Sequence, residues 1–238
     1  AVTPQRLCLG VLNQRMWTRS EHSYGRRVDR AHKSIEEKES VRWLQGYRQV
    51  CALSLENKQT RLVYIADREG DIYDLFVEGE LQQHPADYLI RAHHDRVLME
   101  DGKISDALAC APCLGKVAFH LPHSHKRSQK HVEQVLKATR VTLRQPWLCD
   151  TPIDQVDVTV VLAQETRPPK GQEAMTWILI TNRRIETQAQ AIEALNGYLC
   201  RWQIEVYFRI LKSGCKIEKL QLETMERLQP AIALYMII

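Results

Sequence analysis

The sequence contains no apolar run long enough to cross a membrane. A membrane-spanning helix takes about 18 or more consecutive apolar residues, and no stretch approaches that length. The first residues, AVTPQRLCLG, also lack the charged and then apolar layout of a secretory signal peptide. These absences argue against a membrane-spanning or signal-directed protein, and they predict a cytoplasmic location with no membrane partner.

Strong net charge and an even set of cysteines are also missing. Lys and Arg number 33 against 29 Asp and Glu, so the net charge is only +4 and the position of the cations matters more than their sum. Seven cysteines, an odd number, favour reduced thiols over a disulfide framework. With 238 residues, 44% of them hydrophobic, the chain is long enough for one large globular domain or for a core with an inserted module.

Residues 198–214, YLCRWQIEVYFRILKSG, gather polar side chains along one side of a predicted helix. At about 100° per residue, five of them fall within an arc of about 80°: Tyr198, Arg201, Glu205, Arg209 and Lys212. The opposite side is apolar and predicts a buried back: Ile204, Tyr207, Phe208, Ile210 and Leu211. Gly214 predicts the end of this helix.

The same row has a simpler interpretation, a solvated helix face with an ion pair between Arg201 and Glu205. Such a pair, four residues apart, stabilises a helix by only about 0.2–0.5 kcal/mol. However, cations outnumber the acid on this narrow face, and the aromatic residues Tyr198 and Trp202 lie on it or beside it. We therefore expect the row to have a function beyond solvation.

Residues 62–67, LVYIAD, predict a short strand that is buried on both faces and ends in Asp67. The segment that follows, REGDIYDLF, predicts the start of a helix. Because open α/β sheets bind their ligands at the carboxyl ends of their strands, Asp67 is a candidate functional acid.

The other segments predict an α/β core that is interrupted by an insertion. The core elements are a strand at 7–17, a helix opened by the capping pair Ser34 and Glu37 and ending near Leu55, strands at 87–94 and 175–182, and a helix capped by Thr187. Between them, KVAFHL, KATRVTLR and VDVTVVLA predict an all-β insertion. The predicted organisation is a first core part at 1–94, the insertion at 95–175 and a second core part at 176–238.

Tyr198, Arg201, Glu205 and Lys212 have a spacing that resembles the YREK signature of DDE-type transposases of bacterial insertion sequences, in the IS-four (Tn-five-like) group. Three further segments resemble this family in the same order: EEKES, IADREGDIYDLF and the PPKG that precedes the tryptophan strand. The resemblance covers about 7–236. It implies a ribonuclease-H-like core, lacking its first strands and interrupted by the β insertion.

By this resemblance, Asp67 and Glu205 are the second and third of three catalytic acids. They would bind two Mg²⁺ ions, with Mn²⁺ as a substitute, which activate the attacking oxygen and stabilise the leaving 3′ oxygen. The family's first acid precedes the segment resembling RLCLGVLNQRMW, where this sequence begins, and both ends look cut. Because two of three ligands hold Mg²⁺ poorly, we expect this fragment to be inactive, while its parent protein is an endonuclease and strand-transfer enzyme.

The resemblance also implies a DNA-binding surface. Tyr198, Arg201 and Lys212 match residues that contact phosphates near the transposon end, and such contacts position DNA without reading its sequence. Trp177 matches a tryptophan on which a flipped base stacks, although a tryptophan in an apolar strand is more often a core residue. Two further DNA-binding residues are expected, one matching a family arginine and one in the same polar row: Arg91 and Arg209.

The function implied is cut-and-paste DNA transposition, a form of DNA recombination by a mobile element. A nicked transposon end attacks the opposite strand, the resulting hairpin is reopened, and the end is joined to target DNA. The partners are double-stranded DNA, from the transposon ends and the target, and a second copy of the protein in a homodimer on paired ends. The expected location is the bacterial cytoplasm, at the nucleoid. The main alternative is a non-catalytic DNA-binding remnant or an inhibitor of transposition.

A less favoured alternative, a zinc-dependent nucleic-acid-binding module, depends on a cluster of cysteines and histidines: Cys110, Cys113, His120, His123 and His125. C-x-x-C followed by H-x-x-H resembles zinc-ligand spacing. The six residues between the two pairs are fewer than the ~12–15 of a usual zinc finger. We therefore expect this segment to form a strand and a turn of the insertion.

Overall fold

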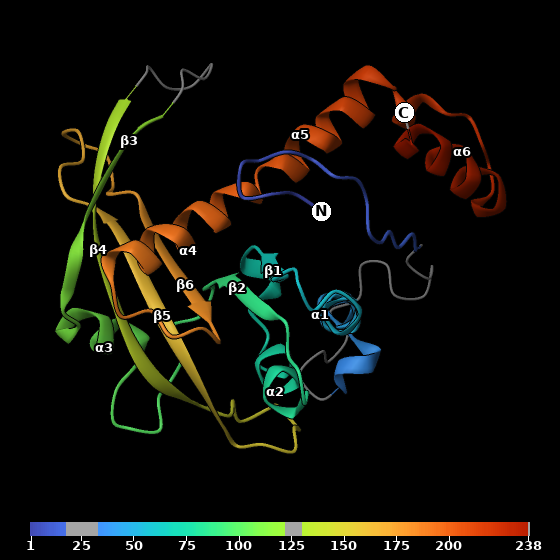
Figure 1. The fold of residues 1–238 in the computed structure, drawn as a ribbon. Coiled ribbons are helices and arrows are strands. Elements are labelled where there is room, and N and C mark those ends of the chain that lie inside the picture. The colour runs from blue at the N-terminus through green and yellow to red at the C-terminus, as the bar shows by residue number, and fades with distance from the viewer. Residues whose placement is uncertain (18–32, 122–129, 238) are drawn as a thin grey trace. The chain divides into compact units, whose positions relative to one another are not determined.

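The computed structural model describes residues 1–17, 33–121 and 130–237 (Figure 1). The chain divides into two units. Unit 1 comprises Ala1–Val28 and Leu199–Ile238, and unit 2 comprises Asp29–Tyr198.

Unit 2 is built on one mixed sheet of six strands in the order β1-β2-β6-β5-β4-β3. The strands are β1 (Val63–Ala66), β2 (Asp87–Arg91), β3 (Cys113–Leu121), β4 (Lys130–Arg144), β5 (Gln155–Glu165) and β6 (Thr176–Thr181). β1 and β2 are parallel, and every other neighbouring pair is antiparallel. The prediction of an α/β fold is therefore confirmed at the level of a mixed sheet with helices.

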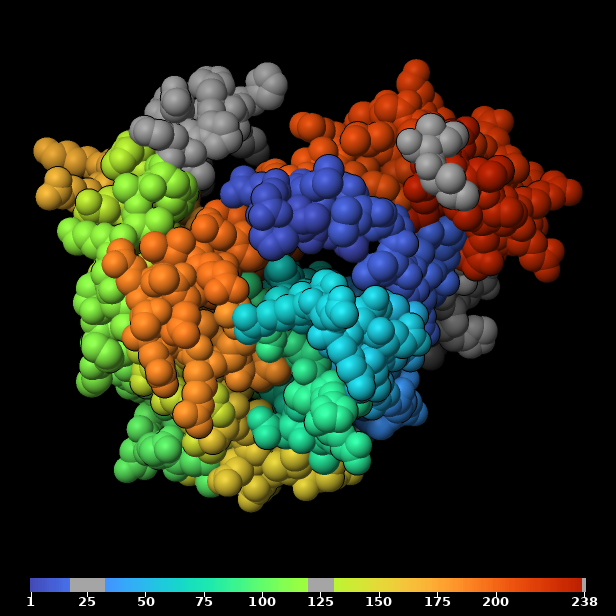
Figure 2. Space-filling view, viewed as in Figure 1, coloured from blue at the N-terminus to red at the C-terminus, as the bar shows by residue number. Residues whose placement is uncertain are grey.

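The sheet has a hydrophobic core on each face because its strands place apolar side chains on both sides. In β5, Val158 and Val160 join the core formed with α1 (Val41–Glu56), α2 (Tyr73–Leu81) and α3 (Ile104–Cys110). Val161 and Ala163 join the opposite core, which includes buried residues of α4 (Gln188–Cys200). Unit 2 thus has helices on both faces of its sheet, and Figure 2 shows α4 (orange) on the visible face.

Both predicted capping groups of unit 2 are present, but only Thr187 opens the helix predicted for it. The acid of the predicted capping pair accepts a hydrogen bond from the Ser34 backbone N–H, with 3.2 Å between that nitrogen and Glu37 Oε2. This pair caps a short 3₁₀ turn, η2 (Ile35–Glu37), and α1 begins only at Val41, because Lys38 between them is extended. The Thr187 hydroxyl accepts from the Gln190 N–H at 3.3 Å and so caps α4 as predicted.

The range predicted as an all-β insertion, 95–175, also contains a helix, α3. Its strands β3, β4 and β5 continue the sheet that β1, β2 and β6 begin. The sequence pattern missed α3 because the helix has only seven residues. Its buried apolar residues, Ile104 and Leu108, cover a single turn, which is too short to show a helical period.

Unit 1 corrects two sequence predictions. Residues 7–17 do not form a strand, and an isolated bridge between Val2 and Cys8 is the only β pairing within this segment and the described residues around it. Leu7 and Leu9 are exposed there, because no hydrogen-bonded ladder in the described part of the unit buries a strand face.

The single helix predicted at 198–214 is interrupted. α4 ends at Cys200, α5 covers Gln203–Arg209, and a π-helical turn, η4, covers Ile210–Gly214. Glu205 N–H bonds to the carbonyl three residues earlier, and Cys215 N–H bonds to the carbonyl five residues earlier. The helix is therefore wound more tightly at Glu205 and more loosely at Cys215 than a regular α-helix. The predicted polar row assumed a constant 100° per residue and did not include this change. The rest of the unit contains η5 (Ile217–Lys219) and α6 (Met225–Ile237).

The predicted apolar back of this helix is mostly exposed. Leu211 is buried and Tyr207 is half-buried, but Ile204, Phe208 and Ile210 are exposed to solvent. In the described residues, no helix is both long and apolar enough to cross a bilayer.

Candidate active site

Asp67 lies directly after β1, at the point where the chain turns into η3 (Arg68–Gly70). Its carboxylate caps this turn, because Oδ1 accepts a hydrogen bond from the Arg68 N–H at 2.8 Å. The side chain remains 36% exposed. The local sequence thus delivers a solvent-accessible carboxylate to the carboxyl end of a strand, as predicted.

Two other predicted site residues contact the same carboxylate oxygen. Arg91 is the last residue of β2. Because β1 and β2 are parallel with Ala66 beside Ile90, Asp67 and Arg91 each come one residue after this pair, at the same edge of the sheet. Its Nη1 lies 3.8 Å from Asp67 Oδ1. The Tyr198 hydroxyl of α4 donates to the same oxygen at 3.2 Å.

Trp177, on β6, extends this group. Its ring centroid lies 6.2 Å from that of Tyr198, and on β3 the ring of Phe119 lies 6.3 Å away and nearly parallel, at 10°. Trp177 and Phe119 are both partly exposed. Four predicted residues, Asp67, Arg91, Tyr198 and Trp177, therefore lie together in unit 2, and Phe119 joins them.

A buried ion pair next to Asp67 ties the ends of β1 and β2 together. Asp71 is 2% exposed, and its Oδ1 accepts from Arg96 Nε at 2.8 Å. Its Oδ2 accepts from the N–H groups of His93 and His94 at 2.7 and 2.9 Å. Because these residues follow β2, the pair fixes the segment after Arg91 to the turn that begins at Asp67.

Burial affects one of these side chains directly. Desolvation lowers the pKa of His94, and the nearby Asp71 carboxylate acts in the opposite direction. The imidazole is therefore neutral near pH 7. The Arg96 guanidinium lies 5.4 Å above the Phe76 ring, which adds a cation–π contact to the buried pair.

The other predicted residues belong to unit 1. Arg201 Nη2 donates to Glu205 Oε1 at 2.7 Å, which is the ion pair of the simpler interpretation. Lys212 Nζ lies 2.9 Å from Glu218 Oε1. Arg209, at the end of α5, is exposed. Asp67 and Glu205 thus lie in different units.

Among the described residues, no three His, Cys, Asp or Glu side chains are grouped closely enough to hold a metal ion. Of the predicted zinc cluster, Cys110 at the end of α3 and Cys113 at the start of β3 are exposed free thiols. His123 and His125 lie outside the described residues.

No protein-family model matches this chain. The site is therefore defined by its own geometry. Sequence reasoning missed Phe119, Asp71 and Arg96. KVAFHL identifies Phe119 only as a strand residue, since its contact with Trp177 joins β3 to β6, which are not neighbours in the sheet. Asp71 looks like any acid before a helix, and only its partner Arg96, 25 residues away, gives it a role.

Proposed function

We propose that this chain is part of a DDE-type transposase with a ribonuclease-H-like core, which cleaves and joins double-stranded DNA with Mg²⁺ or Mn²⁺. The observation that carries the proposal is the position of Asp67 at the carboxyl end of β1, beside Arg91, Tyr198 and Trp177. A carboxylate, a cation, a phenol and an indole from four different elements meet there. This combination suits a phosphodiester bound next to a metal ion.

The residues fit the roles that this function needs. Asp67 and Glu205 would hold the metal ions, since Asp67 is partly exposed and carboxylate oxygens are the ligands that Mg²⁺ prefers. Bound metal would activate the attacking oxygen and stabilise the leaving 3′ oxygen. Tyr198 would orient the Asp67 carboxylate through its hydroxyl, and Arg91 would bind a backbone phosphate.

The aromatic group would act on the bases. Trp177 is partly exposed, between Tyr198 and Phe119, and would support a base displaced from the duplex. Base-on-aromatic stacking is worth about 1–3 kcal/mol per base. The paired DNA ends and the homodimer that holds them belong to this proposal as well.

A second function is favoured by one observation: each predicted catalytic acid lies beside an arginine. Arg91 lies 3.8 Å from Asp67, and Arg201 lies 2.7 Å from Glu205. An arginine that neutralises a carboxylate competes with a metal ion for it. In this alternative the protein binds DNA without cutting it, and the two acids only position phosphate-binding arginines.

One experiment separates the two functions. The full-length protein is loaded with Fe²⁺ in place of Mg²⁺ and treated with ascorbate and peroxide, so that a bound ion cuts the nearby backbone. We expect cuts near residues 67 and 205, and their loss at both places in either Asp67→Asn or Glu205→Gln. Glu226→Gln, which changes an exposed acid on α6, should leave the cuts unchanged.

A nicking assay on DNA with the element's ends completes the test. Mg²⁺-dependent nicking that disappears in Asp67→Asn supports the transposase. DNA binding without local iron cuts and without nicking supports the non-catalytic alternative. A protein that neither binds DNA nor shows localised cuts contradicts both.

A further inference from the structure

Unit 2 has a hollow beside the start of α4, and Asp67 is not among the residues that line it. Its volume is about 500 Å³, and residues of β4, β5, the start of β3 and the segment before α4 line it. Arg140 in this hollow pairs with Thr159, Thr159 with Thr181 and Thr181 with Leu89 across successive strands. The hollow is therefore at the β4 and β5 side of the sheet, whereas Asp67 follows β1 at the opposite edge.

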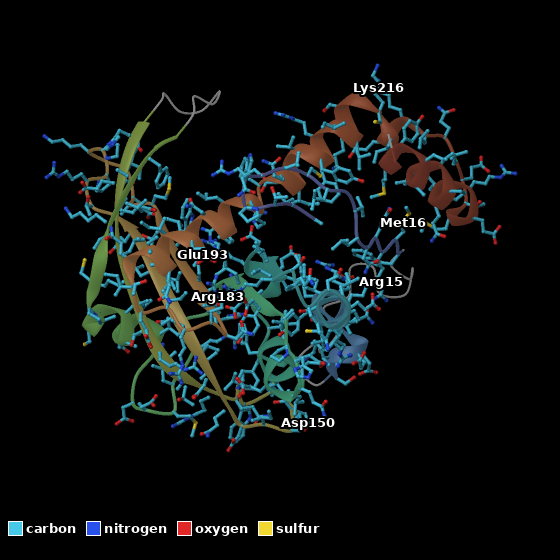
Figure 3. All side chains as sticks on the ribbon, viewed as in Figure 1. Arg15, Met16, Asp150, Arg183, Glu193 and Lys216 are labelled. Atoms are coloured by element: carbon cyan, nitrogen blue, oxygen red, sulfur yellow. The ribbon has the colours of Figure 1, made fainter. Side chains whose placement is uncertain are left out.

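Two arginines give the hollow its charge. Arg184 is exposed and forms no ion pair with any carboxylate in the described part of the chain. Arg140 has a long contact, 3.8 Å from its Nη2 to Asp157 Oδ2, as its one ion pair within the described ranges. The neighbouring Arg183 differs, because it is held by Glu193 in two hydrogen bonds of 3.0 and 3.2 Å (Figure 3). Glu186 is the one acid among the lining residues, so the arginines leave an excess of positive charge.

A buried hydroxyl adds a second, independent feature. Thr159 lines the hollow and is only 2% exposed, and its Oγ1 has no hydrogen-bond partner among the described residues. As the direct cross-strand partner of Arg140, Thr159 projects from the same face of the sheet. Rotation about its Cα–Cβ bond exchanges the methyl group and the hydroxyl. A buried hydroxyl without a partner is unfavourable, and a ligand oxygen in the hollow would supply that partner.

The remaining walls are apolar, which constrains the ligand. Leu114, Ala138 and Ile185 present carbon surface beside the two arginines. Inorganic phosphate would fill only a small part of about 500 Å³, and a volume of this order suits a ligand with a ring as well as a charge. Arginines bind phosphate oxygens in planar, two-pronged contacts.

We infer that this hollow binds a nucleotide, with the phosphate on Arg140 and Arg184 and the base against the apolar wall. The phosphate ester comes either from a free mononucleotide or from a nucleotide within a DNA strand. The inference does not depend on metal binding at Asp67, because none of the residues that line the hollow contacts that site.

Calorimetric titration of the full chain tests the inference with four probes: dAMP, deoxyadenosine, inorganic phosphate, and a short 5′-phosphorylated single-stranded oligonucleotide. We expect dAMP to bind at least tenfold more tightly than deoxyadenosine or inorganic phosphate, because only dAMP contacts both the arginines and the apolar wall. Arg184→Gln and Arg140→Gln should each weaken dAMP binding about tenfold or more. Arg227→Gln, which removes the same charge from an exposed site on α6, should leave it unchanged.

Thr159→Val keeps the shape of the side chain and removes the hydroxyl. It should weaken dAMP binding while leaving the melting temperature of the free protein unchanged or raised, since an unpartnered buried hydroxyl is lost. Tighter binding of the oligonucleotide than of dAMP, lost in Arg184→Gln, would assign the phosphate to a DNA strand, and the reverse order would assign it to a free nucleotide. Absence of dAMP and oligonucleotide binding at millimolar concentration, or equal affinity in wild type, Arg184→Gln and Arg227→Gln, would overturn the inference.

Discussion

At the residue scale, two aspartates four positions apart have opposite environments. Asp67 is partly exposed, and its Oδ1 contacts the Arg68 N–H, the Tyr198 hydroxyl and the Arg91 guanidinium. A carboxylate in such a position can exchange one partner for another. Asp71 is buried and accepts hydrogen bonds from Arg96 and two backbone N–H groups. The first suits a functional group and the second a structural one.

Asp71→Asn should destabilise the protein strongly. The amide cannot neutralise the buried Arg96 guanidinium, and breaking a buried pair on one side costs about 3–5 kcal/mol. Urea unfolding followed by circular dichroism measures the loss. Asp67→Asn is the matched control, since its side chain is partly exposed and its loss should cost about 1 kcal/mol or less. Equal effects of the two substitutions would show that burial of the Asp71 pair has no special importance.

Cys149 predicts a dependence of stability on pH. Burial raises the pKa of its thiol from 9.0 to about 11, and the nearby Asp74 carboxylate, whose Oδ2 lies 3.6 Å from Sγ, acts in the same direction. Above pH 9 the unfolded chain releases this proton, while the folded protein keeps it up to about pH 11. The free energy of unfolding should therefore fall as the pH rises through this window.

The measurement is urea unfolding at pH 8, 9 and 10 in wild type and Cys149→Ala. The variant should lose less stability than wild type between pH 9 and pH 10. Identical slopes for the two proteins would mean that this thiol ionises equally in both states. Restricting the comparison to this interval limits the contribution of Tyr73, whose pKa burial raises to about 12.

At the element scale, the turn η3 and the helix α4 hold the candidate site in place. η3 brings Gly70 so close to β1 that an added Cβ would lie 2.6 Å from the Cβ of Ala66. α4 carries Tyr198 to Asp67 and buries Leu195 and Ala191 against the sheet. The turn thus depends on close backbone approach, whereas the helix depends on apolar packing.

Two glycine substitutions test this difference. Gly70→Ala should destabilise the protein by about 1–3 kcal/mol, because a buried atom is forced into a packed turn. Gly197→Ala should be neutral or stabilising by up to about 1 kcal/mol, since alanine favours a helix and its Cβ would meet Leu89 at an ordinary 3.6 Å. Thermal unfolding of the pair measures both changes. A tolerated Gly70→Ala would contradict the close packing of η3 on β1.

At the scale of the whole molecule, both hydrophobic cores lie within unit 2. One core packs α1, α2 and α3 against the sheet, and the other packs α4 against the opposite face. All buried residues of these two cores belong to Asp29–Tyr198. Unit 2 therefore has what an independently folding domain needs.

Residues 29–198 expressed alone should fold and unfold in one cooperative transition. The free energy of unfolding should stay within a few kcal/mol of that of the whole chain, because both cores are retained. Circular dichroism and urea unfolding of the two proteins provide the comparison. An aggregated product, or one without a cooperative transition, would show that residues 1–28 and 199–238 are needed for folding.

The sequence by itself determined the local structure. The apolar run before Asp67 predicts β1, the DYLIR segment predicts β2, and the Thr187 cap predicts the start of α4, because each signal lies within a few residues of the element that it forms. The placement of Asp67 at a strand end follows for the same reason. The strand predicted at 7–17 fails because a strand also needs a partner, which no local pattern supplies.

Only the tertiary structure decided which distant residues meet. The pairing of β2 with β6, the contact of Phe119 with Trp177, and the ion pair of Asp71 with Arg96 all join segments far apart in the chain. Thr159 reads as an ordinary strand residue, and its unpartnered hydroxyl appears only when β4, β5 and the segment before α4 surround it. Periodicity encodes the face on which a side chain lies, whereas burial and partnership depend on what the folded chain places opposite that face.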